Sequence, residues 1–133
     1  MRRPGILIVT HGALAPELLA AAERILGREL AGFRALSLDW SEGWPEARLR
    51  VEASLAAFPP ETGGFLVLTD LHGDTPSRAA AGLGEEGRVE IVTGVNLPMV
   101  LTALCHWDDS LEKVTALVKE AGSGSIMQET LQQ

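Results

Sequence analysis

The sequence predicts an α/β fold, a three-layer sandwich in which helices cover both faces of a central and mostly parallel sheet. Two observations predict it. Four short strand-like runs alternate with longer segments of helical periodicity, and the connections between them are short. The run ILIV at 6–9 is also continuously apolar, as expected of a strand that is covered on both faces.

Four segments have the composition of strands: ILIV at 6–9, FRALSL at 33–38, FLVLT at 65–69 and VEIVT at 89–93. The first and third are apolar runs of the length of a buried strand, whereas FRALSL alternates between apolar and polar residues. We expect the strand order 2-1-3-4. The tail at 125–131 leaves three alternatives open, namely an extra edge strand, a short helix or no regular structure.

Helices are expected between and after these strands: about 16–26, 45–58, 76–83, a segment that follows the turn at 94–98 and reaches about 105, and 110–121. Apolar residues recur at three- and four-residue spacing along the first two. Gly27 is placed to end the first helix, and Pro45 suits the first turn of the second. Ser110 is a typical N-cap for the last helix, and Gly122 a typical terminator.

The composition fits one soluble globular domain over 1–133. The chain has 133 residues, of which 46% are hydrophobic and 22% are charged, and these values are ordinary for a globular domain. Eleven Lys and Arg residues against 18 Asp and Glu residues give a net charge of −7. This excess of carboxylates argues against a nucleic-acid-binding protein, which needs a basic face for the phosphates.

The cysteine content and the N-terminal region predict a cytoplasmic protein. Cys105 is the single cysteine and therefore forms no intramolecular disulfide, which indicates a reducing compartment. The first apolar run is too short for a signal peptide, and no run is long enough to span a membrane. We expect Cys105 to pack in the core and the adjacent His106 to lie at the surface, because neighbouring residues of a helix do not form a metal pair.

His11 and Asp70 are the candidate reactive pair. They follow the first and the third predicted strands, whose carboxyl ends are adjacent if the strand order is 2-1-3-4. In open α/β sheets ligands bind at this point, where the connections turn to opposite faces. A carboxylate that accepts the N–H of one imidazole nitrogen fixes the tautomer and leaves the other nitrogen free as a nucleophile. The alternative role of Asp70 is an ordinary helix N-cap.

The segment HGDTPSRAA after Asp70 predicts an anion-binding loop beside this pair. Gly73 allows close backbone approach, Thr75 offers a hydroxyl group, and Pro76 at the first position of a helix leaves N–H groups directed into the crevice. A nucleophilic histidine beside such a loop suggests phosphoryl transfer through a phosphohistidine. The alternative role of Thr75 is a helix cap.

Three motifs carry a resemblance to a known family. THG at 10–12, DLHGDTPSRAA at 70–80 and GVNLPM at 94–99 look like the three signatures of the IIA proteins of the mannose-type phosphoenolpyruvate-dependent phosphotransferase system (PTS). The resemblance covers nearly the whole chain, in matching order and length. It implies a cytoplasmic phosphocarrier that takes a phosphoryl group from the phosphohistidine of HPr and passes it to a IIB protein or domain, for carbohydrate uptake and phosphorylation or for their regulation.

The resemblance also implies roles for individual residues. His11 would be phosphorylated at Nε2, and Asp70 would orient its Nδ1–H. Thr75 and the loop amides around Gly73 and Asp74 would cradle the phosphoryl oxygens. No metal ion or other cofactor is implied. Family members of this type are dimers, so we expect a homodimer that is at most peripheral to a membrane transporter.

The chain departs from the family pattern within this loop. Asp74 stands where the family often has glycine, Arg78 where it often has asparagine, and His72 where the residue is usually aromatic or apolar. An inward-pointing Asp74 carboxylate would repel a phosphoryl group. We therefore expect Asp74 to turn outward and pair with Arg78, an interaction worth about 0.2–0.5 kcal/mol. The alternative is a partner surface that differs from that of sugar-transporting relatives.

Two other functions stay open from the sequence. A small tetrapyrrole metal chelatase also begins with a strand followed by HG, and His11 and His72 would be its metal ligands. The GDTPS loop and the GVNLPM motif favour the phosphocarrier, because a chelatase needs neither. A regulatory protein that reports the state of the PTS to another protein would use the same His11 chemistry.

Trp40 and Trp44 lie in the loop after the second strand, on the same edge of the sheet as His11. Tryptophan is favoured at the centres of protein interfaces, so both are candidate anchors for a partner protein. The alternative is that this loop packs against the body of the domain. The turn at 94–98 is expected to set the rim of the site rather than to supply reacting groups.

Overall fold

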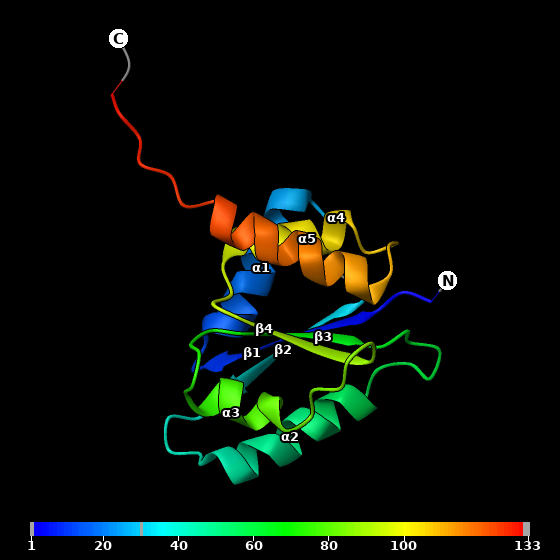
Figure 1. The fold of residues 1–133 in the computed structure, drawn as a ribbon. Coiled ribbons are helices and arrows are strands. Elements are labelled where there is room, and N and C mark those ends of the chain that lie inside the picture. The colour runs from blue at the N-terminus through cyan, green and yellow to red at the C-terminus, as the bar shows by residue number, and fades with distance from the viewer. Residues whose placement is uncertain (1, 30, 132–133) are drawn as a thin grey trace.

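The computed structural model describes residues 2–29 and 31–131, and within them strands and helices alternate as expected (Figure 1). The strands are β1 (Gly5–His11), β2 (Phe33–Leu38), β3 (Phe65–Thr69) and β4 (Val89–Thr93). The helices are α1 (Leu14–Leu26), α2 (Trp44–Ala56), α3 (Thr75–Ala81), α4 (Leu97–Cys105) and α5 (Leu111–Gly124). Each predicted strand and helix is therefore confirmed in its expected place along the chain.

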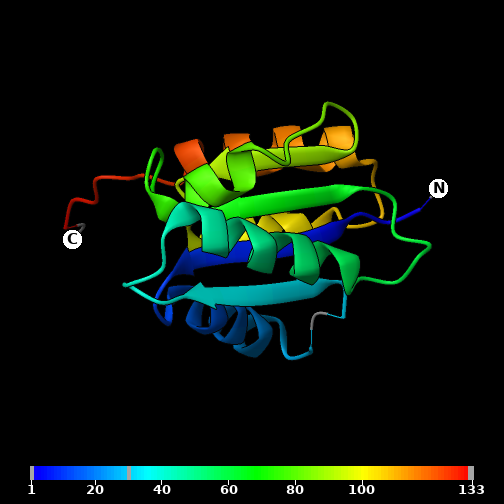
Figure 2. The same ribbon diagram turned by 90° about the horizontal axis from the view of Figure 1, so that it is seen from below.

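The strands form one parallel sheet in the order β2-β1-β3-β4, which confirms the predicted order (Figure 2). The register places Val9 opposite Thr69. The last residue of β1, His11, and the residue that follows β3, Asp70, therefore lie at neighbouring strand ends. This edge of the sheet is the one where ligands bind in open α/β folds.

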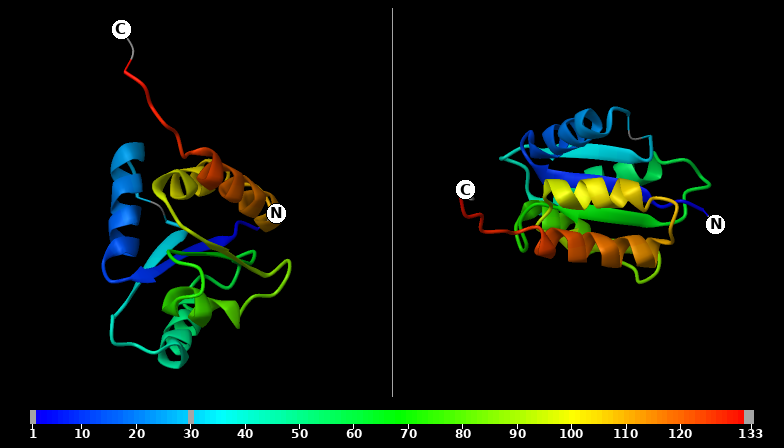
Figure 3. Two further views of the ribbon diagram at one scale, coloured as in Figure 1. Left: turned by 60° about the vertical axis from the view of Figure 1, so that its left-hand side comes forward. Right: turned by 90° about the horizontal axis from the view of Figure 1, so that it is seen from above.

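Helices cover both faces of the sheet and make the predicted three-layer sandwich. Helices α1, α4 and α5 lie on one face, and α2 and α3 lie on the other (Figures 1 and 3). Along β1, Ile6 and Ile8 belong to the core under the first group, whereas Leu7 and Val9 belong to the core under the second. This alternation explains why ILIV is continuously apolar, since every one of its side chains is buried.

The last helix extends further than predicted. Ser110 is its N-cap and accepts a hydrogen bond from the N–H of Lys113 at 3.2 Å, but α5 runs through Gly122 to Gly124. A Cβ at Gly122 would lie 2.7 Å from Cγ and Sδ of Met99 in α4. Gly122 is thus needed for the close approach of two helices, and the prediction that it ends α5 is wrong.

The tail at 126–131 has no regular structure and extends away from the body of the domain (Figures 1 and 3). Within the described residues it adds no edge strand to the sheet, which resolves the alternatives left open for it. Its apolar side chains at Ile126, Met127 and Leu131 are exposed. Residues 132–133 lie outside the described part.

Cys105 is exposed, so the prediction that it packs in the core is wrong. It is the last residue of α4, and the preceding Leu104 faces the core instead. An apolar stretch predicts a buried helix, but the position around the helix decides which side chains are buried. His106 is half-buried, and its Nδ1 lies 3.3 Å from Oδ2 of Asp109.

Among the helices of residues 2–29 and 31–131, none combines the length and the apolar composition needed to span a membrane. The longest of them, α5, has 14 residues.

Candidate functional site

His11 and Asp70 meet at the carboxyl ends of β1 and β3, as expected from the strand order. Oδ2 of Asp70 lies 2.8 Å from Nδ1 of His11, and the same oxygen accepts a hydrogen bond from the backbone N–H of His11 at 3.0 Å. Oδ1 accepts from the N–H of Leu71 at 2.9 Å. The side chains of His11 and Asp70 are 16% and 13% exposed. Asp70 therefore holds both the backbone and the ring of His11, and Nε2 is the ring nitrogen directed away from it.

Thr10 ties His11 to the helix that follows it. Its side chain is buried, and its Oγ1 accepts a hydrogen bond from the N–H of Ala15 at 2.7 Å and donates to the carbonyl of His11 at 3.2 Å. Gly12 completes this turn with φ at +51°, a value that side chains rarely tolerate. The backbone around His11 is thus fixed from both sides. This role of Thr10 was not predicted, because its partner Ala15 is recognisable only in the folded turn.

Asp74 points toward His11, so the prediction that it turns outward and pairs with Arg78 is wrong. Its Oδ2 lies 3.1 Å from Nε2 of His11, while its Oδ1 accepts a hydrogen bond from the N–H of Thr75 at 2.9 Å. The guanidinium of Arg78 lies instead over the ring of Trp44, 5.4 Å from its centroid. Arg78 therefore makes a cation–π contact with Trp44 of α2 instead of an ion pair with Asp74.

The loop amides predicted to cradle an anion take part in hydrogen bonds within the loop. The N–H of Gly73 donates to Oγ of Ser77 at 2.9 Å, and the N–H of Asp74 donates to the carbonyl of Leu71 at 3.3 Å. Gly73 has φ at +85°, and a Cβ there would meet nothing within 4 Å. Glycine is therefore favoured at this position for its backbone conformation.

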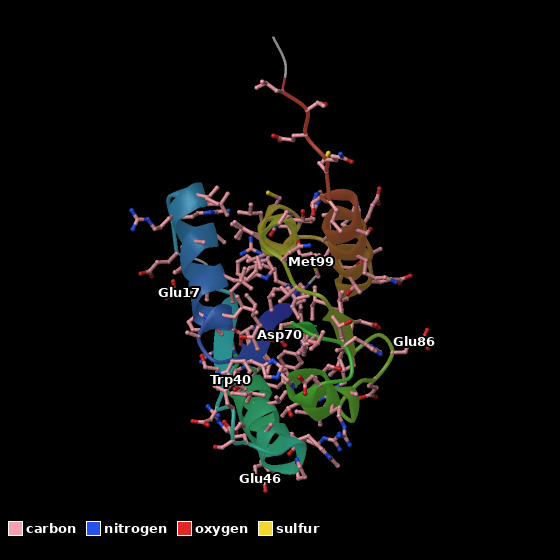
Figure 4. All side chains as sticks on the ribbon, turned by 90° about the vertical axis from the view of Figure 1, so that its left-hand side faces the viewer. Glu17, Trp40, Glu46, Asp70, Glu86 and Met99 are labelled. Atoms are coloured by element: carbon pink, nitrogen blue, oxygen red, sulfur yellow. The ribbon has the colours of Figure 1, made fainter. Side chains whose placement is uncertain are left out.

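Trp40 covers the imidazole of His11. The two rings are stacked, with their centroids 4.9 Å apart and their planes at 19°. Trp40 is nevertheless 78% exposed, and Figure 4 labels it together with Asp70 on the side of the domain that faces the viewer. One ring face of Trp40 thus packs on the site while much of the side chain faces solvent, and its role as an anchor for a partner protein stays a prediction.

The loop that carries Trp40 is ordered by its own polar groups. Oδ1 of Asp39 accepts hydrogen bonds from the N–H and the Oγ of Ser41, at 2.9 and 2.8 Å. These hydrogen bonds hold the pKa of the Asp39 carboxyl below its usual value, because they favour the ionised form. The N–H of Asp39 donates to Glu42, whose carboxylate pairs with Arg50 in α2.

The turn at 94–98 adjoins the site without supplying a reacting group. The N–H of Val95 donates at 2.9 Å to the carbonyl of Thr69, the residue before Asp70. Asn96 caps α4, since its Oδ1 accepts from the N–H of Met99 at 3.1 Å. This segment therefore fixes the end of β3, in agreement with its predicted place at the rim.

The geometry does not favour the metal-binding alternative. His72 is exposed, and both ring nitrogens of His11 face the carboxylates of Asp70 and Asp74. Within residues 2–29 and 31–131, no three His, Cys, Asp or Glu side chains are grouped so that they could hold a metal ion.

A histidine and an aspartate at adjacent strand ends of a 2-1-3-4 parallel sheet define a small α/β domain with a histidine-centred site. Residues 5–121 match the family model EIIA-man, described as the PTS system fructose IIA component. The chain therefore belongs to the mannose-type IIA family of the phosphotransferase system, and the resemblance seen in its motifs is confirmed.

Individual relatives agree with this assignment. The chain is 35% identical over 127 residues to the PTS system mannose-specific EIIAB component of Escherichia coli (strain K12), and the match covers 91% of the chain. It spans only 38% of the length of that relative.

Two solved structures share the fold. The mannose/sorbose specific IIA subunit from Enterococcus faecalis is 26% identical with a TM-score of 0.83, over 100% of this chain and 98% of that one. The PTS IIA protein associated with the fucose utilization operon from Streptococcus pneumoniae is 26% identical with a TM-score of 0.80, over 96% and 93% of the two chains. The α/β sandwich described above is thus a fold that members of this system share.

Proposed function

We propose that this chain is a phosphocarrier of the PTS. His11 accepts a phosphoryl group at Nε2 from the phosphohistidine of HPr and passes it to a IIB protein or domain, in carbohydrate uptake and phosphorylation or in their regulation. The observation that carries this proposal is the contact of 2.8 Å between Nδ1 of His11 and Asp70, in a chain that belongs to the mannose-type IIA family. The activity is protein-histidine phosphoryl transfer.

The role of Asp70 follows from the chemistry of imidazole. By accepting the Nδ1–H, its carboxylate selects the neutral tautomer in which Nε2 carries a lone pair. This lone pair forms a new N–P bond while the P–N bond of the donor phosphohistidine breaks, and the bonding pair stays with the donor ring. The phosphorylated ring keeps its Nδ1–H, so the contact with Asp70 persists until the phosphoryl group moves on to IIB.

The loop after β3 supplies the surroundings of the phosphoryl group. We assign the phosphoryl oxygens to the hydroxyl of Thr75 and to the amides around Gly73 and Asp74. The approach of Asp74 to within 3.1 Å of Nε2 supports this assignment, because it brings the loop to the acceptor nitrogen. The loop amides must then exchange their present hydrogen bonds for bonds to the phosphoryl oxygens. Trp40, stacked on the ring, limits access of water to the phosphohistidine.

The partners in this proposal are HPr, a IIB component and a second copy of the chain. The match covers 38% of the E. coli relative, whose name combines IIA and IIB. The homodimer is supported by the exposed apolar side chains of the tail, Ile126, Met127 and Leu131. We place the protein in the cytoplasm, at most peripheral to a membrane transporter.

The three histidines of the chain provide a controlled test. The protein is incubated with enzyme I, HPr and phosphoenolpyruvate, and mass spectrometry locates the phosphoryl group. We expect it on His11, lost in His11→Ala and retained in His72→Ala and His106→Ala. A protein that stays unphosphorylated at every pH where phosphohistidine survives, or that carries the group on His72 or His106, would contradict the proposal.

A further inference from the structure

We propose that Asp74 acts as a brake on the phosphoryl-acceptor nitrogen. In the unphosphorylated protein the Asp74 carboxylate contacts Nε2 of His11. This carboxylate must turn away before Nε2 can accept a phosphoryl group. This inference rests on the proposed function of His11 and adds a regulatory residue to it. Asp74 then sets how fast the chain is loaded and how long it stays loaded.

Two carboxylates face the imidazole of His11. Oδ2 of Asp70 lies 2.8 Å from Nδ1, and Oδ2 of Asp74 lies 3.1 Å from Nε2. An ionised carboxylate only accepts hydrogen bonds, so each contact is a hydrogen bond only when the nitrogen that it faces carries a hydrogen. A hydrogen bond from Nε2 to Asp74 therefore takes up the nitrogen that must offer its lone pair to phosphorus.

The two aspartates differ in their freedom to move. Asp70 is 13% exposed and is held by the N–H groups of His11 and Leu71 as well as by the ring. The side chain of Asp74 is 50% exposed, and beyond His11 its carboxylate is anchored by the N–H of Thr75. Asp74 can therefore rotate into solvent without disturbing buried groups, whereas Asp70 cannot.

The balance of the transfer step shows what the contact with Asp74 blocks. Before transfer, Nε2 must lose its proton to solvent or to the Asp74 carboxylate, and that carboxylate must turn away. The freed lone pair then forms the bond to phosphorus as the donor P–N bond breaks. After transfer, the phosphoryl group and the Asp74 carboxylate are both negative, so their repulsion keeps the side chain turned outward and favours loss of the group.

The contact can be tested first in the unphosphorylated protein. We would record the ring ¹⁵N resonances of His11 near neutral pH in the wild type, Asp74→Asn and Asp74→Ser. Both variants keep an oxygen that can cap α3, so folding is preserved. Asp109→Asn is the matched control, because it removes the carboxylate beside His106. We expect a smaller fraction of protonated Nε2 in both Asp74 variants and an unchanged His11 signal in the control; equal signals in all four proteins would overturn the proposal.

The brake is then tested by kinetics. We expect phospho-HPr to phosphorylate His11 about five- to tenfold faster in both Asp74 variants, because removing a charged hydrogen-bond partner frees Nε2. We expect their phosphohistidine to be hydrolysed more slowly, because the repulsion between the Asp74 carboxylate and the phosphoryl group is gone. If the wild type and the variants are phosphorylated at equal rates, or the variants more slowly, the brake alone is overturned. If none of them is phosphorylated on His11, the proposed function is overturned and the brake with it.

Discussion

Oδ2 of Asp70 contacts both the backbone nitrogen and the ring nitrogen Nδ1 of His11, at 3.0 and 2.8 Å. A single carboxylate oxygen therefore fixes the position of the strand end and the orientation of the imidazole. The two residues are 59 positions apart in the sequence and meet because β1 and β3 are neighbours in the sheet. The reactive nitrogen of the proposed mechanism depends on this one oxygen.

The Asp70→Asn variant tests that dependence. An amide directs either an oxygen or an NH₂ group at Nδ1, and the NH₂ group stabilises the tautomer that has no lone pair on Nε2. We expect phosphoryl transfer from phospho-HPr to slow by roughly 100-fold or more. The rate of His11 phosphorylation is the measurement, with Asp109→Asn as the control for loss of an aspartate elsewhere. A wild-type rate in Asp70→Asn would refute the role of Asp70.

The stack of Trp40 on His11 predicts an optical signal of phosphorylation. The indole lies 4.9 Å from the imidazole between centroids, so a change in the charge of the ring alters its fluorescence. We expect the emission of the protein to change when His11 is phosphorylated, and we expect Trp40→Phe to abolish that change. Trp44→Phe and Trp107→Phe are matched controls that keep it. A change that survives in Trp40→Phe would place the reporting indole elsewhere.

The sequence predicted the strands well because burial on both faces leaves a direct trace in composition. The run at 6–9 is apolar at every position, and each of its side chains is buried. The meeting of His11 and Asp70 then followed from the strand order. Properties that depend on short local runs or on the alternation of buried faces can be inferred from one sequence.

The orientation of Asp74 was not predictable in this way. The local rule favoured a pair with Arg78, but the structure offers Arg78 the face of Trp44 and offers Asp74 the imidazole of His11. Both competing partners are distant in sequence, so no local pattern reveals them. The same reason explains the error at Gly122. This glycine lies within α5 and allows the close approach of Met99 in α4, a residue distant in sequence, whereas the local rule predicted a helix end.

Gly12→Ala tests the turn that carries His11. Gly12 has φ at +51°, and an added Cβ would lie 3.3 Å from Nε1 of Trp40. We expect a loss of about 1–2 kcal/mol in the free energy of unfolding and a change in Trp40 fluorescence. Gly87→Ala shares the positive φ, at +78°, but its Cβ would meet nothing within 4 Å. It should lose similar stability in urea unfolding and leave the fluorescence of Trp40 unchanged; identical spectra for both variants would argue against the contact.

A pair of glycines in α5 tests the packing of this helix. A Cβ at Gly122 would lie 2.7 Å from the buried Met99, whereas a Cβ at Gly124 would meet nothing within 4 Å. We expect Gly122→Ala to reduce the free energy of unfolding by about 1–3 kcal/mol through overpacking. Gly124→Ala should be neutral or raise it by up to about 1 kcal/mol, since alanine is the better helix former. Denaturant titrations of both variants measure the difference, and equal midpoints would contradict it.

The exposed tail predicts how the proposed homodimer depends on chain length. Ile126, Met127 and Leu131 are 84%, 76% and 91% exposed, and a second copy that covers them would remove this apolar surface from water. We expect the full chain to be dimeric in light scattering coupled to size-exclusion chromatography, and a chain that ends at residue 125 to be monomeric but folded. Ile126→Ser with Met127→Ser keeps the length and should weaken the dimer in the same direction. A truncated chain that stays dimeric would show that the interface lies elsewhere on the domain, and a monomeric full chain would remove the homodimer from the proposal.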